Sequence, residues 1–230
     1  AGKPDEFAGS EGRSERIAEH DTLGAGPTPS IDELGEAGVV FENAVTPFPE
    51  TAPAHAAMFV GMHPVRMGVL SNGHALHPRY HTLAEMLEEE GYATAAFVSS
   101  FAVDSRSGLD QGFQVYDDDF FPAVRGLSSI RLSSYALRAL MRFGNPLEYR
   151  SLLERDGEDT LGRALSWLRD NGRRPFFMWV HLFEPHAPYE THGAAGAPTI
   201  DHRQILANEP DQYDAKMVED LRELYAEEVL

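Results

Sequence analysis

The sequence predicts an α/β fold with a mostly parallel central sheet, and two observations lead to that prediction. An amphipathic segment at 81–90 ends at Gly91 and is followed by the apolar run 93–98. A helical pattern at 158–171 precedes a second apolar run at 176–183. Strands that are apolar on both faces are typical of parallel sheets covered by helices on both sides. At 230 residues, the chain is long enough for one large domain with a substantial core.

The first predicted elements precede residue 50. Residues 1–27 are rich in Gly, Glu, Ser and Arg without hydrophobic periodicity, so we expect a disordered leader. A helix is predicted to begin at Pro29, because proline and acidic residues in the first turn are typical helix starts. It is predicted to stop at Gly38. The run 39–45 that follows is predicted as a short strand ending in a proline-containing loop.

A buried helix is predicted at 52–60, because its residues are small and apolar. It begins just after Thr51 and is ended by Gly61. The remaining segments are assigned from the same signals: irregular chain at 62–80 and 190–208, a loop at 104–125, and helices at 126–144 and 211–229. The sequence shows no internal repeat and no linker that would divide the chain into two domains.

The composition narrows the classes of partner. There are 19 basic and 37 acidic residues, a net charge of −18, which disfavours nucleic acid and anionic membranes as partners. The absence of cysteine excludes disulfides and thiolate zinc sites. No apolar run reaches the roughly 20 residues of a membrane span, and no secretory signal is visible. The compartment and the oligomeric state are left undetermined.

Candidate chemistry lies where two predicted strands end, since ligands bind at the carboxyl ends of strands in open α/β sheets. The loop after 39–45 carries Thr51 and His55, and the loop after 176–183 carries His186. At a helix start, the dipole and free N–H groups favour negative charge. A threonine hydroxyl there becomes a nucleophile when a metal or base activates it. His55 lies on the same helical face and can donate to an ester oxygen or exchange a proton with a leaving group.

The same residues also fit structural roles. Threonine before a helix is a common N-cap, and histidines such as His63 and His186 beside prolines can be satisfied turn residues. Asp117–Asp119 can form a cation site, but a solvated acidic loop is the more common arrangement in so acidic a chain. Spacing alone therefore leaves both interpretations open.

As an ordered set, the motifs resemble the sulfatase family of the alkaline-phosphatase superfamily. The matching stretches are TPSIDEL at 28–34, GVVFENA at 38–44, TAPAH at 51–55, LDQGF at 109–113 and the strand with its histidine loop at 176–189. In sulfatases the nucleophile motif is Cys (or Ser)-x-Pro-x-Arg. Here Thr51 and His55 stand at its first and last positions, with Gly61, Pro64, Arg66 and Gly68 in register after it.

The resemblance implies a fold, an activity and a cofactor. It implies a sulfatase-like (alkaline-phosphatase-like) α/β sandwich with a mostly parallel central sheet, incomplete at both ends, with residues 28–230 forming a partial catalytic domain. It implies a hydrolase of sulfuric or phosphoric esters in which Thr51 is the nucleophile and a ligand of a divalent metal (Ca, Mg, Mn or Zn). His55 and His186 would bind the non-bridging oxygens or protonate the leaving group. The substrate would be a small-molecule, glycan or lipid ester.

Departures from the family pattern leave other functions open. Thr51 cannot become formylglycine, and Val98-Ser99-Ser100-Phe101 replaces the family's Gly-Lys-x-His element. Thr-x-Pro-x-His is similar to the motif of nucleotide pyrophosphatase/phosphodiesterases, so a phosphodiesterase or phosphoryl transferase is one alternative. A degenerate, non-catalytic domain is another. The resemblance implies further metal ligands on an Asp-bearing first strand and in an Asp-His pair. No apolar strand with an aspartate precedes residue 28, and the Asp-His pair would lie beyond Leu230. We therefore expect the 230-residue chain alone to be inactive.

Overall fold

The computed structural model describes residues 28–119, 154–186 and 214–229. The chain divides into two compact units, Ala44–Glu184 and a unit formed by Ala1–Asn43 with Pro185–Leu230. The first contains helices α3 (Thr51–Val60), α4 (Pro64–Met67), α5 (Leu83–Glu89) and α8 (Gly157–Asn171), 3-10 turns η1 (Phe101–Val103) and η2 (Ser105–Ser107), and strands β1 (Ala93–Val98), β2 (Val115–Asp117) and β3 (Phe176–His181). The second contains α2 (Pro29–Ala37) and α10 (Ala215–Val229).

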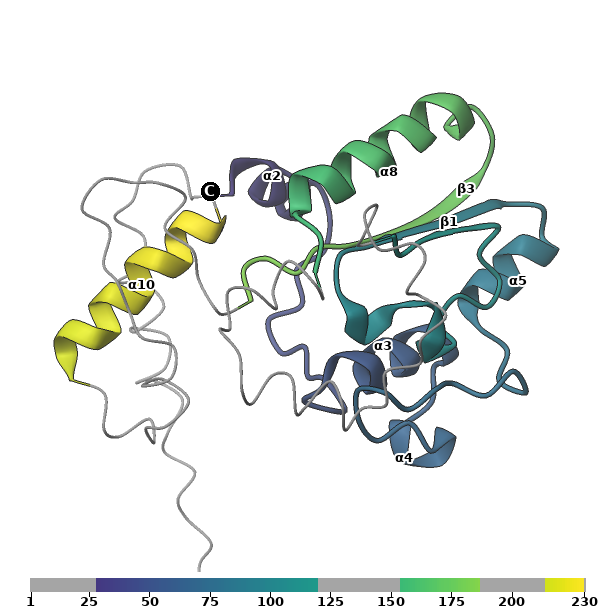
Figure 1. Cartoon of the computed structure of the whole chain (residues 1–230). Coiled ribbons are helices and arrows are strands. Elements are labelled where there is room, and N and C mark those ends of the chain that lie inside the picture. The colour runs from purple at the N-terminus through teal and green to yellow at the C-terminus, as the bar shows by residue number, and fades with distance from the viewer. Residues whose placement is uncertain (1–27, 120–153, 187–213, 230) are drawn as a thin grey trace, which may run out of the picture. The chain divides into compact units, whose positions relative to one another are not determined.

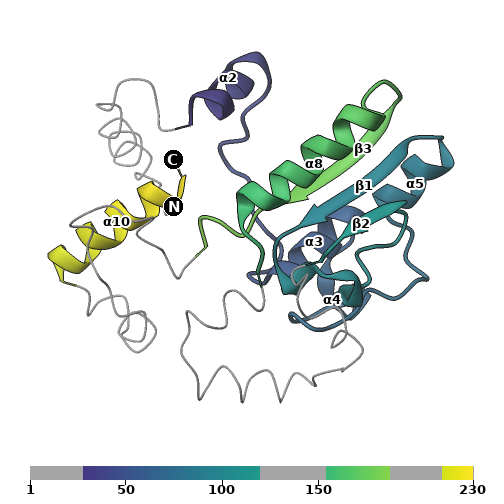
Figure 2. The same ribbon diagram turned by 45° about the horizontal axis from the view of Figure 1, so that its top comes forward.

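The larger unit is built on a parallel sheet in the order β2-β1-β3. Strand β1 is central and all six of its residues are buried. Helix α8 covers one face of the sheet, and α3 and α5 lie on the other (Figures 1 and 2). This arrangement confirms the predicted α/β fold, because a central strand apolar on both faces needs a helical layer on each side.

Alternation along β3 assigns its side chains to the two layers. Phe177 and Trp179 pack in the cluster that includes residues of α3, whereas Met178 and Val180 pack against α8. Since successive side chains of a strand point to opposite faces, His181 falls on the α3 side with Phe177 and Trp179. The last residue of β3 is therefore a histidine directed toward α3.

The LDQGF stretch is a packing motif in this structure. Thr82 caps α5 in a capping box with Glu85, and the Thr82 hydroxyl also donates to the carbonyl of Gln111 (3.0 Å). Gly112 lies directly against the first turn of α5 with φ of +83°. A Cβ there would come within 2.1 Å of the Glu85 nitrogen, so only glycine fits.

Three sequence-based assignments need correction. The strand predicted at 39–45 is wrong: these residues lie in turns and irregular chain, and Val39, Val40 and Phe41 are 79%, 69% and 78% exposed. An apolar β-branched run forms a strand only where a neighbour pairs with it. The predicted loop 104–125 contains the short strand β2, which pairs with Ala95–Phe97. The segment 62–80, predicted as irregular, contains α4.

The other assignments within the described residues are confirmed. Five predicted helices and two predicted strands appear with ends shifted by a few residues. The helices are those predicted after Thr28 and at 52–60, 81–90, 158–171 and 211–229, and the strands are those at 93–98 and 176–183. The leader 1–27, the helix at 126–144 and the irregular segment 190–208 lie outside the described residues. The division into a leader and a partial catalytic domain stays a prediction.

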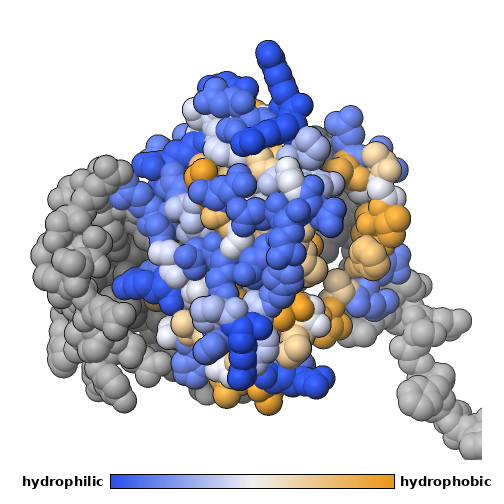
Figure 3. Space-filling model, turned by 90° about the vertical axis from the view of Figure 1, so that its right-hand side faces the viewer, coloured by the Kyte–Doolittle hydropathy of each residue, from blue (hydrophilic) through white to orange (hydrophobic). Residues whose placement is uncertain are grey.

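The surface agrees with the acidic composition. The face in Figure 3 is mainly hydrophilic, with apolar side chains in small groups. In the smaller unit, α2 buries none of its residues, whereas α10 buries Leu224. None of the helices in the described ranges has the length and apolar character needed to cross a membrane.

Candidate functional site

Thr51 is the first residue of α3, and its hydroxyl does not cap the helix. The N-cap residue is Glu50, in an extended conformation, and no side-chain capping bond is formed by it. The Thr51 hydroxyl is half-buried and makes no hydrogen bond to any of the described residues. The structural alternative, in which Thr51 serves as an N-cap, therefore finds no support in this geometry.

Asn72 caps the start of α3 from a distant loop. The N–H of Ala52 donates to Asn72 Oδ1 (2.9 Å), and the N–H of Asn72 donates to Glu50 Oε2 (2.8 Å). A backbone N–H can only donate, which fixes Oδ1 as the acceptor and turns the Nδ2 amide away from the helix. Nδ2 has no acceptor among the described residues.

The expectation of several free N–H groups at this helix start needs correction. Ala52 is bound to Asn72, Pro53 has no N–H, and Ala54 donates to the Glu50 carbonyl (3.1 Å). The N–H of Thr51 is the one left without an acceptor within the described ranges. Donors for a developing negative charge are therefore the Thr51 N–H and the Asn72 amide, rather than a row of helix N–H groups.

His55 lies one turn after Thr51 on α3, as predicted. Its Nδ1 lies 2.8 Å from the carbonyl oxygen of Thr51. A carbonyl only accepts, so Nδ1 carries the proton and the neutral ring keeps a lone pair on Nε2. Burial lowers the pKa of His55, although the bond to Thr51 acts in the opposite direction. His55 is therefore a neutral proton acceptor at pH 7.

His181 is a member of this group that sequence reasoning missed. Its ring centroid lies 5.2 Å from that of His55, edge on, and Trp179 contacts both rings at 5.3 and 5.9 Å. Burial lowers the pKa of His181 to about 4, with a smaller contribution from His55. Its Nδ1 is buried without a hydrogen-bond partner among the described residues. A histidine ending a buried strand, two residues after Trp179, was the signal that could have found it.

Ser99 and Ser100, which replace the family's Lys-bearing element, have local structural roles. Ser99 donates to the His181 carbonyl through both its N–H (3.0 Å) and its hydroxyl (2.8 Å), which fixes the end of β3. The Ser100 hydroxyl accepts from the N–H of Ala102 at the start of η1 (3.3 Å). Ser99 therefore holds the backbone that presents His181, and Ser100 caps the first turn of η1.

His186 is exposed and follows a turn at residues 184–185. It belongs to the smaller unit, whereas Thr51, His55, Asn72 and His181 belong to the larger one. Its predicted role toward the ester stays a prediction.

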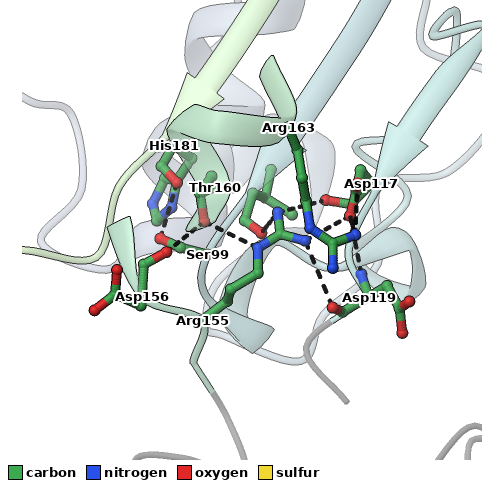
Figure 4. Close-up of polar contacts among 9 residues, drawn as sticks. Ser99, Asp117, Asp119, Arg155, Asp156, Thr160, Arg163 and His181 are labelled. Atoms are coloured by element: carbon green, nitrogen blue, oxygen red, sulfur yellow. Dashed lines mark hydrogen bonds and ion pairs between the residues drawn. The ribbon is translucent and has the colours of Figure 1, made fainter. Parts of the chain in front are cut away.

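A second polar cluster lies at the carboxyl ends of β1 and β2 (Figure 4). Arg155, with a side chain 5% exposed, donates to Thr160 Oγ1 (2.9 Å), Asp117 Oδ1 (2.5 Å) and the Val98 carbonyl (3.0 Å). It also reaches the carbonyls of Asp117 (3.3 Å) and Asp119 (3.5 Å). All five guanidinium N–H groups are thereby engaged, so Arg155 is a structural residue.

Asp117 is therefore neither a solvated acidic residue nor a cation ligand. Arg163 contacts its other carboxylate oxygen at 3.1 Å. Burial raises the pKa of Asp117, but the hydrogen bonds and charges of Arg155 and Arg163 outweigh it and hold that pKa below its ordinary value. The acidic run at 117–119 gave no hint of these partners, which come from residues about 40 positions away along the chain.

The described residues do not by themselves fit a divalent-metal site. Within 28–119, 154–186 and 214–229, no three His, Asp or Glu side chains converge on a point where they could hold a metal ion. Thr51, predicted as a metal ligand, has no carboxylate co-ligand there. A metal would need ligands from elsewhere in the protein.

Comparisons with known proteins agree with the motifs. The sulfatase family model matches residues 16–220. Arylsulfatase K of Rattus norvegicus is 26% identical over 191 residues, covering 81% of this chain and 32% of its own length. The multifunctional alkaline phosphatase superfamily protein PehA of Trinickia caryophylli is 24% identical, covering 70% and 37%.

A solved structure shows the same fold. The phosphonate monoester hydrolase of Agrobacterium radiobacter superposes with a TM-score of 0.55 at 17% identity, covering 88% of this chain and 51% of that one. The chain spans about a third of the length of the curated relatives it matches. The predicted resemblance and the alkaline-phosphatase-like α/β fold are confirmed, and the chain belongs to the sulfatase family.

Proposed function

We propose that the whole protein hydrolyses sulfuric or phosphoric esters with Thr51 as the nucleophile. Membership of a family of alkaline-phosphatase superfamily hydrolases supports ester hydrolysis in general. The observation that carries the assignment to Thr51 is its half-buried hydroxyl at the start of α3, which has no hydrogen-bond partner among the described residues. A polar group without a structural role beside other unpaired polar groups is a candidate for chemistry.

In the proposed reaction, Thr51 Oγ forms a bond to the sulfur or phosphorus as the bond to the leaving oxygen breaks. The Thr51 proton passes to Nε2 of His55 and from there to the leaving oxygen, so charge balances over the step. Water then releases the product from Thr51 with His55 acting in reverse. The Nδ1 bond to the Thr51 carbonyl favours this proton-transfer role for His55 over donation to the non-bridging oxygens.

The non-bridging oxygens need donors in the transition state. The Asn72 Nδ2 amide and the Thr51 N–H are suited to this, because both are donors without an acceptor among the described residues. Preorganised donors of this kind stabilise developing charge. We also retain His186 as a proposed contact to the ester, and a small-molecule, glycan or lipid ester as the substrate.

The sulfatase and alkaline-phosphatase-like family generally uses a divalent metal. We propose Thr51 as one ligand, with the remaining ligands outside the described residues and Ca, Mg, Mn and Zn as the candidates. The proton transfers between Thr51, His55 and the leaving oxygen do not require this metal.

The alternatives are separated by substrate. Thr-x-Pro-x-His and a neutral His55 in place of arginine favour a phosphodiesterase or phosphoryl transferase as the second candidate. A substrate panel of para-nitrophenyl sulfate, para-nitrophenyl phosphate and bis(para-nitrophenyl) phosphate distinguishes these activities. No turnover of any panel member under any of the four metals would favour the degenerate, non-catalytic domain.

The nucleophile is tested by trapping the covalent intermediate. The full-length protein is mixed with the best panel substrate, quenched in acid, and digested for mass spectrometry. We expect a sulfuryl or phosphoryl group on the peptide that contains Thr51, its persistence in Thr51→Ser, and its loss with turnover in Thr51→Ala. Turnover that survives Thr51→Ala would contradict the mechanism. The 230-residue chain alone, assayed in parallel, is expected to be inactive.

A further inference from the structure

We propose that Glu50 is a positioning residue for the reaction: its carboxylate ties Asn72 to the start of α3 and so fixes Thr51 between them. This inference rests on the proposed function, in which Thr51 is the nucleophile. Glu50 belongs to neither the catalytic motif nor the predicted metal ligands, and the proton-transfer steps above do not use it.

The geometry is a closed ring of two hydrogen bonds. Glu50 Oε2 accepts from the N–H of Asn72 (2.8 Å), which lies 22 positions further along the chain. Asn72 Oδ1 then accepts from the N–H of Ala52 (2.9 Å). Thr51 lies between Glu50 and Ala52, so both peptide neighbours of the nucleophile are bound to the same asparagine.

The loop that carries Asn72 is internally stiff. His74 Nδ1 accepts from the N–H of Leu70 (3.1 Å), and the N–H of His74 donates to the Ser71 carbonyl (3.1 Å). On either side of the loop, Val69 and Leu76 are buried. These bonds and the two buried residues hold the loop locally, and the Glu50 bond joins its tip to α3.

An ordinary capping role does not account for the Glu50 side chain. Among the described residues its carboxylate makes no bond to the N–H groups of α3 and reaches the Asn72 backbone instead. A carboxylate beside a site for anionic esters also opposes binding through like charge. Glu50 therefore lowers substrate affinity but keeps the Asn72 amide and the Thr51 hydroxyl correctly placed relative to each other. We expect such a residue to affect the rate of the chemical step.

The proposal predicts a graded kinetic effect in the full-length protein. Glu50→Ala is expected to lower kcat about 10- to 100-fold with a much smaller change in KM, because misplaced reacting groups cost rate more than affinity. Glu50→Gln keeps an acceptor for the Asn72 N–H and is expected to stay within about threefold of wild type. Glu88→Ala is the matched control, since the Glu88 side chain is exposed and makes no hydrogen bond within the described ranges; it is expected to leave kcat unchanged.

Two further measurements test whether Glu50 affects kcat through Asn72. If Glu50 acts through Asn72, Glu50→Ala adds little further loss of kcat in an Asn72→Ala background, since coupled residues are not additive. Hydrogen–deuterium exchange of the full-length protein is expected to speed up in the peptide covering residues 69–76 in Glu50→Ala and to stay at the wild-type rate in Glu88→Ala.

The outcomes separate the two proposals. Thr51→Ala inactive, Glu50→Ala slow and Glu50→Gln restored is the expected result. Thr51→Ala inactive with Glu50→Ala at the wild-type kcat overturns the role of Glu50 alone. Full additivity of Glu50→Ala and Asn72→Ala also overturns it, because Glu50 would then act by another route. Turnover retained in Thr51→Ala overturns the proposed function, and this inference with it.

Discussion

Two polar clusters near the carboxyl ends of the strands differ in how completely their hydrogen bonds are satisfied. In the Arg155 cluster, every guanidinium N–H has an acceptor and Asp117 is paired with two arginines. In the Thr51 cluster, the Thr51 hydroxyl, the Asn72 amide and His181 Nδ1 have no partner among the described residues. Both clusters join segments far apart in sequence, yet only the second has unused donors and acceptors.

The difference separates stability from chemistry. Buried polar groups that are fully paired rigidify a fold, as around Arg155, whereas buried His181 Nδ1 carries the energetic cost of an unpaired group. Thr51 is half-buried and Asn72 is exposed, so their polar groups are accessible to a ligand. We therefore expect substitutions in the Arg155 cluster to change the free energy of unfolding. Substitutions in the Thr51 cluster should change turnover with little change in stability.

The largest expected effect is on turnover in Thr51→Val. This near-isosteric change removes the hydroxyl, and we expect kcat of the full-length protein to fall by about 10⁴-fold or more. The free energy of unfolding, measured in urea, should change by less than about 0.5 kcal/mol, because the hydroxyl has no partner to lose. Thr82→Val is the reverse control. It breaks bonds to Glu85 and Gln111 and should cost about 1–3 kcal/mol of stability while sparing kcat.

Arg155→Met tests the opposite cluster. Removing the guanidinium leaves Asp117, whose side chain is 18% exposed, without its main partner, and we expect a loss of about 3–5 kcal/mol in the free energy of unfolding. Urea denaturation measures the loss. Arg169→Met, at an exposed position of α8 where the side chain makes no hydrogen bond to the described residues, should change stability by less than about 0.5 kcal/mol. Equal losses in the two variants would remove the distinction between the clusters.

Asn72→Asp tests the two roles of the Asn72 side chain, which are to accept a hydrogen bond from the start of α3 and to donate one to the substrate. Aspartate keeps an acceptor for the N–H of Ala52 but loses the Nδ2 donors, so stability should stay within about 0.5 kcal/mol of wild type. Turnover should fall at least about 100-fold, because one transition-state donor is lost and the new carboxylate repels an anionic ester. An active Asn72→Asp enzyme would show that the amide is not a donor in the reaction.

The smallest expected effect is a pH dependence of stability from His181. Its pKa is about 4 in the folded chain against about 6.5 when unfolded, so the unfolded state binds more protons between those values. The contribution of neutral His181 is complete above about pH 6.5 and is lost as pH falls toward 4. It amounts to about 2 kcal/mol between pH 8 and pH 5. Urea titrations at both pH values should show a smaller loss in His181→Phe than in wild type. An unchanged loss would mean that His181 titrates normally.

Local patterns predicted most of the fold and part of the site. The helix starts, the glycine stops and the two apolar runs identified α3, α5, α8, β1 and β3, because these depend on neighbours within a few positions. The motif TAPAH identified Thr51 and His55. The strand expected at 39–45 failed because strand formation depends on a partner that local sequence does not specify.

The sequence by itself determined the family, the parallel sheet and the position of Thr51 at a helix start. Tertiary structure decided which polar groups find a hydrogen-bond partner among the described residues and which do not. Arg155 meets Asp117 from 38 positions away, Asn72 reaches Ala52 from 20 positions away, and His181 meets the ring of His55 across the sheet–helix interface. Hydrogen bonding at such separations depends on the packed fold, because no local rule on the chain brings those atoms together.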